Sequence, residues 1–391
     1  MSNQTIPTLC PRLSALCVFR ELLKAPMLQA LMDFAKSSEP IDTYSRFVAE
    51  IYRGGGNLTD CVRKMVFEDE NMYVTAIAAR RSVDPHITAS VKRELDTLSQ
   101  LAALSPKDFT ELLGGVPVAE FSSEQADLYA EYSARIAEIH KHGYGIFASS
   151  GMFRLSDTGE RHIEPIVSAD RSSIESFTGY EDQRARVIAN TQAFVDGKPA
   201  ANVLLYGDAG TGKSSTVKAV ANLFFCEGVR LIELRKDQMS SLPFVMEKIS
   251  RNPLKFIIFI DDLSFNRNDD TFSMLKAALE GSASAKATNA VIYATSNRRH
   301  IVRECFDDRE GSDVHRNDTM QELLSLSARF GLTVQFPKPD KTLYLQIVRE
   351  LAQKRGIVKD IPSLEIEAEA FALRRGHRSA RCAEQFIDSL L

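Results

Sequence analysis

Residues 203–214 read Val-Leu-Leu-Tyr-Gly-Asp-Ala-Gly-Thr-Gly-Lys-Ser. An apolar strand leads into a glycine-rich turn that fits G-x-x-x-x-G-K-[ST] at every fixed position, and a helix follows from Lys213. Glycines let the backbone turn so that consecutive N–H groups face an anion, and the helix adds its positive N-terminal end. The stretch therefore predicts a phosphate-binding loop at the edge of an α/β sheet.

The residues of this loop have different expected contacts. Lys213 is expected to reach the β- and γ-phosphates of a nucleotide, and Ser214 is expected to ligate magnesium. The other residues predicted to bind the nucleotide are Gly207, Asp208, Ala209, Gly210, Thr211, Gly212 and Ser215. ATP and Mg²⁺ are the predicted cofactors, although phosphate binding alone does not establish hydrolysis.

A second stretch, residues 256–262, places two carboxylates after a strand. It reads Phe-Ile-Ile-Phe-Ile-Asp-Asp, and its apolar part is typical of a strand buried on both faces. Open α/β sheets bind ligands at the carboxyl ends of their strands. Asp261 is therefore predicted to hold magnesium, and Asp262 to orient or polarise the attacking water. The alternative is a strand that simply ends in a polar turn.

The surrounding sequence alternates between strands and helices, which favours a parallel sheet covered on both faces, a three-layer αβα fold. The predicted strands are 202–206, 230–234, 255–260, 289–294 and 332–336, and the predicted helices between them include 180–196, 238–250 and 272–279. The predicted domains are a mainly helical region at 1–142, a connector with possible short strands (146–147 and 152–155) at 143–178, a nucleotide-binding core at 179–337 and a helical lid at 338–391.

Composition limits the remaining function classes. Apolar residues make up 44% of the 391 residues and charged residues 26%, as in globular proteins, and the net charge of −4 gives no basic field that would attract nucleic acid or an anionic membrane. The six cysteines are scattered, without a C-x-x-C pair, which favours reduced thiols. No secretory pattern and no long apolar run stands out, so we expect a cytoplasmic protein with no membrane contact.

The chain resembles the AAA+ ATPases, and among them the bacterial ATP-binding proteins of domain-of-unknown-function family 815. The resemblance covers about 174–391. The matching runs are 177–181, 202–208, 261–265, 293–300, 326–332, 378–381 and 386–388. The AAA+ ATPases most commonly end the acidic strand in Asp-Glu, whereas this chain has Asp261-Asp262, a pair also seen in their replication-initiator and helicase-loader relatives. Because Asp is one methylene shorter, this departure bears on the turnover rate rather than on nucleotide binding.

The resemblance implies roles for four further residues. Tyr180 matches the segment that lies against adenine, and Asn297 matches the polar sensor between the second acid and the γ-phosphate. Arg329 matches the arginine finger that reaches into a neighbouring subunit. Arg381 matches the second sensor arginine on the lid, with Arg378 as the competing choice.

Each of these residues also has a simpler interpretation. Asn297 could cap the segment that follows it. Arg329 could form a surface salt bridge, and Arg381 could belong to a solvated basic face. A basic run at 298–303 could touch nucleic acid, but the overall acidic balance does not indicate it.

Three functions are compatible with these features. The leading hypothesis is a magnesium-dependent ATP hydrolase that forms a homo-oligomer, as a ring or an open assembly, with Arg329 acting in trans. It would remodel or load an unknown protein client that the N-terminal helical region recognises. The second is a slow, nucleotide-gated switch, motivated by Asp262. The third is a small-molecule kinase, which the Asn297 strand end and the helical lid disfavour.

Overall fold

The computed structural model describes residues 5–157, 161–170, 172–263, 275, 279, 288–297 and 329–391. They form two compact units, one comprising Met1–Ser149 with Arg251–Pro253, and the other Ser150–Ser250 with Leu254–Leu391. Most of the helix predicted at 272–279, and all of the basic run at 298–303, lie outside the described residues. Within the described ranges, no helix has the length and apolarity needed to cross a bilayer.

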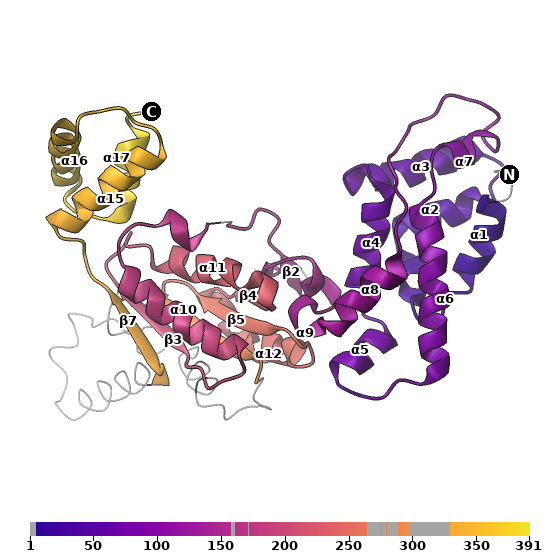
Figure 1. The fold of residues 1–391 in the computed structure, drawn as a ribbon, viewed down its shortest axis with the longest axis horizontal. Coiled ribbons are helices and arrows are strands. Elements are labelled where there is room, and N and C mark those ends of the chain that lie inside the picture. Colours follow the sequence, from indigo (N-terminus) through magenta and orange to yellow (C-terminus); the bar gives the residue numbers. More distant parts are fainter. Residues whose placement is uncertain are drawn as a thin grey trace. The chain divides into compact units, whose positions relative to one another are not determined.

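The first unit is helical, as predicted for residues 1–142 (Figure 1). Leu95, Leu98 and Leu101 are fully buried on one face of α6 (Pro85–Ala102), and Phe109 packs among the rings of Phe34 and Tyr44. The helices are α1 (Thr5–Ser14), α2 (Pro26–Phe34), α3 (Pro40–Arg53), α4 (Leu58–Glu68), α5 (Met72–Ala78), α6 (Pro85–Ala102), α7 (Lys107–Thr110), α8 (Leu128–Ala137) and α9 (Ile139–His142).

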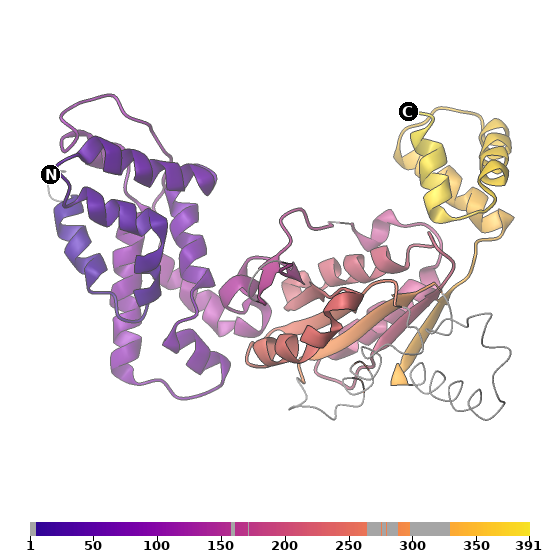
Figure 2. The same cartoon turned by 180° about the vertical axis from the view of Figure 1, so that it is seen from behind.

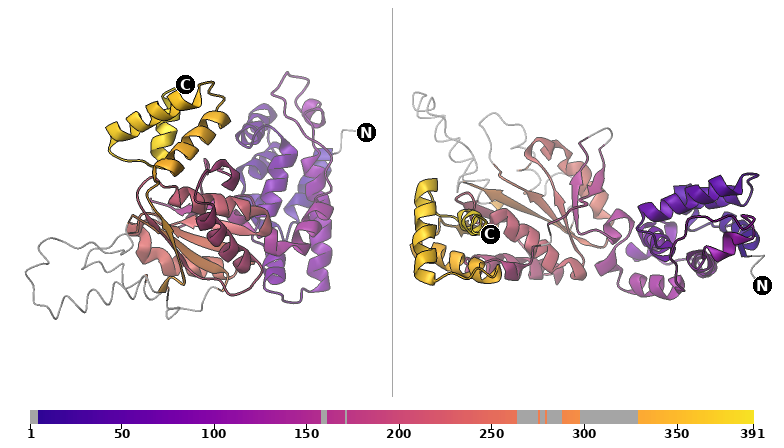
Figure 3. Two further views of the ribbon diagram at one scale, coloured as in Figure 1. Left: turned by 60° about the vertical axis from the view of Figure 1, so that its left-hand side comes forward. Right: turned by 90° about the horizontal axis from the view of Figure 1, so that it is seen from above.

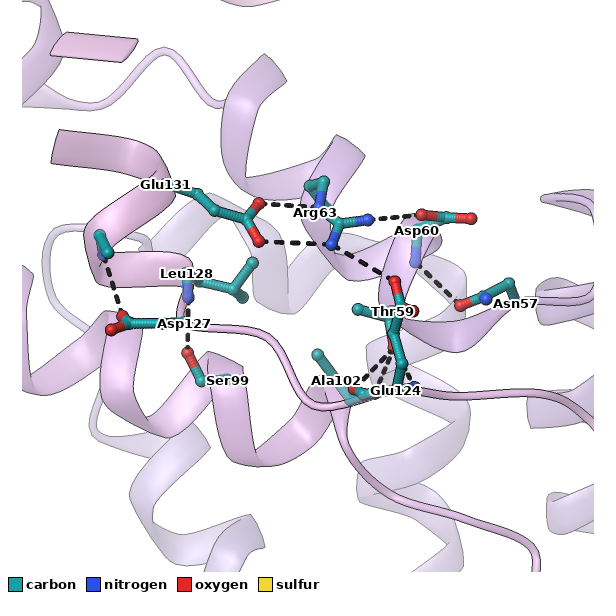
Figure 4. Close-up of polar contacts among 11 residues, drawn as sticks. Asn57, Thr59, Asp60, Arg63, Ser99, Ala102, Glu124, Asp127, Leu128 and Glu131 are labelled. Carbon is teal, nitrogen blue, oxygen red and sulfur yellow. Dashed lines mark hydrogen bonds and ion pairs between the residues drawn. The ribbon is translucent and has the colours of Figure 1, made fainter. Parts of the chain in front are cut away.

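Polar contacts hold the long segment between α7 and α8 against α4 (Figure 4). The buried Thr59 hydroxyl donates to the Ala102 carbonyl at 2.9 Å and accepts the Glu124 amide at 2.9 Å. Arg63 of α4 donates through Nε to Glu131 of α8 at 2.8 Å and through Nη1 to Asp60 at 2.5 Å. About 17 residues separate the end of α7 from the start of α8, which is long for a connection within a compact domain. These bonds fix the position of α8 at the end of that segment.

The second unit is built on a seven-stranded sheet in the order β2-β1-β4-β5-β6-β3-β7. Every neighbouring pair is parallel except β1 with β2. The strands are β1 (Met152–Leu155), β2 (Ile163–Pro165), β3 (Val203–Gly207), β4 (Val229–Glu233), β5 (Lys255–Ile260), β6 (Ala290–Ser296) and β7 (Leu332–Phe336). The carboxyl ends of β3, β5 and β6 therefore meet along one edge of the sheet.

Both faces of this sheet are buried. Ile257 and Phe259 of β5 pack in one cluster with Val187 of α10 (Glu181–Val195) and Val217 of α11 (Lys213–Leu223). Ile258, which points to the opposite face by the alternation of a strand, is also fully buried. The helix α12 (Leu242–Ser250) lies against β6. This arrangement, seen from behind in Figure 2, confirms the predicted αβα fold with helical flanks.

The segment predicted as a connector contributes β1 and β2 to the edge of the sheet next to β4. The strand predicted at 146–147 is wrong, because Gly145–Ala148 forms a 3-10 helix, η2. Gly145 has a φ of 66°, in the left-handed region that favours glycine, and this turns the backbone where a strand would have to be extended. Apolar residues alone did not distinguish the two.

The chain ends in three helices, α15 (Lys341–Lys354), α16 (Ile361–Arg375) and α17 (Ala380–Asp388). The three helices pack on one another (Figure 3). Tyr344, Ala368 and Phe386 are buried in the core between them. Asp340, Asp360 and Ser379 cap the three N-termini through their side chains, as these residue types commonly do. The bundle therefore has an apolar core separate from that of the sheet.

Candidate nucleotide-binding site

The predicted phosphate loop joins β3 to α11. Gly207 ends β3 with a φ of 140°, and a Cβ atom there would lie 1.9 Å from the Phe336 carbonyl oxygen of β7. Gly212 stands at the N-cap of α11 with a φ of 87°. The loop thus needs glycine at Gly207 because a neighbouring strand approaches closely, and at Gly212 because the backbone is left-handed.

Lys213 lies almost buried at the start of α11. Its ammonium donates to the carbonyls of Gly207 at 2.8 Å and Asp208 at 2.7 Å. Burial lowers the pKa of Lys213, and nearby carboxylates, Asp208 first among them, oppose this shift. The ammonium is therefore partly desolvated and held at the base of the loop, where a phosphate oxygen would be a stronger acceptor than a carbonyl.

The two acids at the end of β5 have different partners. Oδ1 of Asp261 accepts from the Ser214 hydroxyl at 2.6 Å and from the Thr295 hydroxyl at 2.5 Å. The same Thr295 oxygen accepts the backbone N–H of Asp262 at 2.9 Å. Thr295 thus links β6 to both acids. Sequence reasoning missed this contact, because the sequence of neither strand determines the register in which β5 and β6 pair.

Asn297, which follows β6, lies between the second acid and the loop lysine. Its amide nitrogen donates to Oδ1 of Asp262 at 2.8 Å, and its amide oxygen accepts from the Lys213 ammonium at 3.1 Å. Asp262 has a φ of 49°, an uncommon left-handed conformation for a residue other than glycine. The contact with Asn297 fixes the direction of a side chain on this strained backbone.

A cavity of about 300 Å³ opens beside these groups, within the range of small-ligand sites. It brings together most of the residues predicted to bind or act on the nucleotide. These are Tyr180, Ala209, Gly210, Thr211, Gly212, Lys213, Ser214, Ser215, Asp261, Asp262, Asn297 and Arg381. Gly207 and Asp208 begin the loop, and their carbonyls accept hydrogen bonds from the Lys213 ammonium.

The two candidate lid arginines have different surroundings. Arg381 lines the cavity, and its backbone N–H donates to the Gly210 carbonyl at 3.2 Å, so the start of α17 touches the phosphate loop. Arg378 instead forms two hydrogen bonds with Glu369 of α16, at 2.9 and 2.8 Å. Of these two arginines, Arg381 therefore lines the cavity, whereas the Arg378 guanidinium is held by Glu369.

Tyr180 packs between the sheet and the lid connection. Its ring lies 5.3 Å from that of Phe336, and its hydroxyl donates to the Pro337 carbonyl at 2.7 Å. Burial raises the pKa of Tyr180 to about 12, so the hydroxyl keeps the proton that this bond needs. Tyr180 thus forms an apolar part of the cavity wall.

The segment before Tyr180 also contacts the lid. Thr178 donates its hydroxyl proton to Glu350 of α15 at 2.7 Å, and Lys354 donates to the Ser176 carbonyl at 2.8 Å. A Cβ atom on Gly179 would lie 2.6 Å from the Leu343 side chain. One face of α15 therefore rests on this segment, and the cavity lies between the lid and the phosphate loop.

Arg329 is placed elsewhere. Arg329 comes just before β7. Gly331, two residues further along, lies against Ala201, which precedes β3. Since β3 and β7 are parallel, Arg329 lies at the amino edge of the sheet, roughly one strand length, about 17 Å, from the phosphate loop. Accordingly, the described residues that line the cavity do not include Arg329.

The sheet order, the phosphate loop after β3, the acids after β5 and the helical lid define a P-loop nucleotide-binding protein of the AAA+ type. The sequence profile of the family described as "Protein of unknown function (DUF815)" matches residues 148–391. The chain belongs to this family, which confirms the resemblance inferred from the sequence.

Curated relatives are more distant. The chain is 23% identical over 208 residues to the proteasome-activating nucleotidase of Methanocaldococcus jannaschii, which covers 49% of this chain and 44% of that protein. It is 24% identical over 178 residues to the 26S proteasome regulatory subunit 6B homolog of Dictyostelium discoideum (42% and 40%). It is 26% identical over 236 residues to the ATP-dependent zinc metalloprotease FtsH of Opitutus terrae (56% and 36%). The chain thus spans less than half the length of these relatives.

Among solved structures, a mutant of Thermotoga maritima RuvB matches with a TM-score of 0.38 and 15% identity. That match covers 55% of this chain and 63% of the RuvB chain.

Proposed function

We propose that this protein binds ATP with Mg²⁺ in the cavity and hydrolyses it. The observation that carries the proposal is the double contact of Asn297, which joins Lys213 of the phosphate loop to Asp262 beside it. A phosphate-binding cation and a water-directing acid are thereby held on either side of the position that a γ-phosphate would take.

The donor set at the end of β5 fits magnesium. The Ser214 hydroxyl and the Asp261 carboxylate are hard oxygen ligands, and they lie 2.6 Å apart. When bound, Mg²⁺ would neutralise charge on the β- and γ-phosphates. In this proposal Ser214 and Asp261 would hold the metal ion, and Thr295 keeps the Asp261 carboxylate oriented.

The remaining residues divide the work of hydrolysis. Lys213 binds phosphate oxygens, and Asp262 accepts a hydrogen bond from the attacking water and directs it. Asn297 orients the Asp262 carboxylate, and Arg381 contacts the phosphates from the lid. Tyr180 lies on the adenine side, and the N–H groups from Ala209 to Ser215 surround the phosphates.

Arg329 acts in trans in this proposal. Its position at the amino edge of the sheet favours contact with a neighbouring subunit over its own site. An arginine that arrives from a neighbour stabilises charge in the transition state and makes hydrolysis depend on assembly. We infer a homo-oligomer, as a ring or an open assembly, that remodels or loads a protein client through its N-terminal helical unit.

A mixing experiment tests this arrangement. Lys213→Ala and Arg329→Ala chains are each expected to be inactive. When the two are mixed in equal amounts, about one quarter of the interfaces combine an intact Lys213 with a neighbour's intact Arg329. Recovery of about that share of wild-type phosphate release is expected. If the mixture stays inactive while the variants still assemble with each other, the trans role of Arg329 is wrong.

The second candidate is a slow, nucleotide-gated switch. Asp262 is shorter than glutamate, and one of its oxygens is already bonded to Asn297. Asp262→Glu distinguishes the two functions. In a slow switch the longer acid is expected to raise the turnover number, whereas in a hydrolase shaped around Asp it is expected to lower it.

A further inference from the structure

Arg184 is a buried cation at the cavity that neither the sequence motifs nor the proposed mechanism uses. It lies one turn after Tyr180 in α10, and only 6% of its surface is exposed. It lines the same cavity as Lys213. Arg186, two residues further along the helix, is exposed and donates to the Thr333 carbonyl at 3.1 Å. The two arginines of this helix therefore point to different surroundings.

The protein satisfies little of the hydrogen-bonding capacity of Arg184. A guanidinium has five N–H donors and no acceptor. Among the described residues, its side-chain partner is Glu181, at a long 3.3 Å, and the Glu181 side chain is 69% exposed. Glu350, the other carboxylate that acts on its charge, already accepts from Thr178 and Gln346.

The spare donors of Arg184 face open space. Nε and Nη1 of Arg184 are not among the described side-chain nitrogens that are both sealed from solvent and without a partner. The unpaired N–H groups of Arg184 are therefore not enclosed by protein, and the cavity is the open space that this side chain lines. Burial also lowers the pKa of Arg184, so a bound acceptor would offset a real desolvation cost.

The position of Arg184 indicates which part of a nucleotide it would meet. The phosphate end of the cavity is defined by the loop and Lys213. Its other walls are Tyr180 and, on α15, Ile347 and Leu351, which are apolar or aromatic as a base-binding wall usually is. Arg184 belongs to this second group, because it lies one turn after Tyr180 on α10, where its backbone N–H donates to the Tyr180 carbonyl at 3.0 Å.

We propose that Arg184 donates hydrogen bonds to a ring acceptor on the purine base of the bound nucleotide and so holds the base in the cavity. This inference rests on the nucleotide site of the proposed function. A donor-only group cannot accept a hydrogen bond from an exocyclic amine, so its partner is a ring nitrogen or, in guanine, N7 with O6.

Binding to the full chain, measured by titration calorimetry, tests this proposal with ATP, GTP and inorganic triphosphate. Arg184→Met removes the donors and keeps an unbranched side chain. We expect it to weaken the binding of the preferred purine triphosphate about ten- to hundredfold, as loss of a charged hydrogen bond does, and to leave inorganic triphosphate within about twofold. Arg186→Met, the matched control on the same helix, is expected to change neither.

Analogues of the preferred nucleotide in which N1, N3 or N7 is replaced by C–H test the same contact without any mutation. The wild-type chain is expected to bind one analogue about tenfold more weakly, and Arg184→Met is expected not to discriminate against it. Equal weakening of nucleotide and inorganic triphosphate by Arg184→Met would overturn the proposal, as would equal binding of all analogues by the wild type. A wild-type chain that binds nucleotide but releases no phosphate contradicts only the proposed hydrolysis.

Discussion

Thr295 is expected to position the two acids of the site, and Thr295→Val tests this directly. The side chain is 2% exposed, and its hydroxyl joins Oδ1 of Asp261 at 2.5 Å to the backbone N–H of Asp262 at 2.9 Å. Valine keeps the shape and removes both bonds. A hydrogen bond to a charged group contributes about 1.5–3 kcal/mol and a neutral one about 1 kcal/mol.

The expected loss for Thr295→Val lies toward the lower end of their sum, about 2–3 kcal/mol, because two of the affected groups keep other partners. Asp261 still accepts from Ser214, and the Asp262 N–H still lies 3.1 Å from Oδ1 of Asp261. Thr295→Ser is the matched control. It keeps the hydroxyl and loses one buried methyl group, at a cost of about 1 kcal/mol.

Two measurements separate the positioning role of Thr295 from simple destabilisation. Urea unfolding followed by circular dichroism gives the stability of each variant. The magnesium concentration for half-maximal ATP hydrolysis reports the orientation of Asp261, and Thr295→Val is expected to raise it severalfold while Thr295→Ser restores it. Equal magnesium requirements for Val and Ser would refute the reasoning, even if Val proved less stable.

Two further predictions concern the lid and the first unit. Arg381→Gln is expected to weaken ATP binding about tenfold, because Arg381 lines the cavity. Arg378→Gln, which breaks the pair with Glu369, is expected to leave the Kd for ATP within about twofold of the wild-type value. Titration of each variant with ATP compares the two. In the first unit, burial raises the pKa of Asp69 to about 6 from 3.8, so its stabilising effect is complete only below about pH 3.8 and is lost as the pH rises from there through about 6. The wild type is therefore expected to lose on the order of 2 kcal/mol relative to Asp69→Asn between pH 4 and 7, measured by urea unfolding.

The strands could be predicted where the sequence itself carries the signal. The predicted strands at 255–260 and 332–336 match β5 and β7 residue for residue. In β5 the apolar run 256–260 is buried on both faces. In β7 the buried Val334 and Phe336 alternate with exposed residues, as on a strand with one buried face. The phosphate loop could be read equally well, because each of its glycines answers a local backbone requirement. The connector was harder to predict, since Ile146 and Phe147 are apolar in a 3-10 helix as they would be in a strand.

The residues that sequence reasoning missed act through partners far along the chain. Thr295 meets Asp261 only because β6 pairs with β5 in a register that brings Ala294 beside Ile260. Arg184 sits in a charged helix that looks solvated, and only the folded chain shows that it is buried while Arg186 is exposed. Tertiary packing, rather than local pattern, assigns these two side chains to the site.

The lid contacts the sheet-containing part of the unit at both ends of the cavity, so the cavity lies between the two places where these parts meet. At the phosphate end, the Arg381 N–H bonds to the Gly210 carbonyl. At the other end, Thr178 bonds to Glu350, whose charge acts on Arg184. A nucleotide that engages Arg381 with its phosphates and Arg184 with its base would bridge the same two places. The affinity for the nucleotide therefore depends on both contacts at once. If a single lid position serves both ends, the loss of binding free energy in the double variant should be smaller than the sum of the losses in the two single variants.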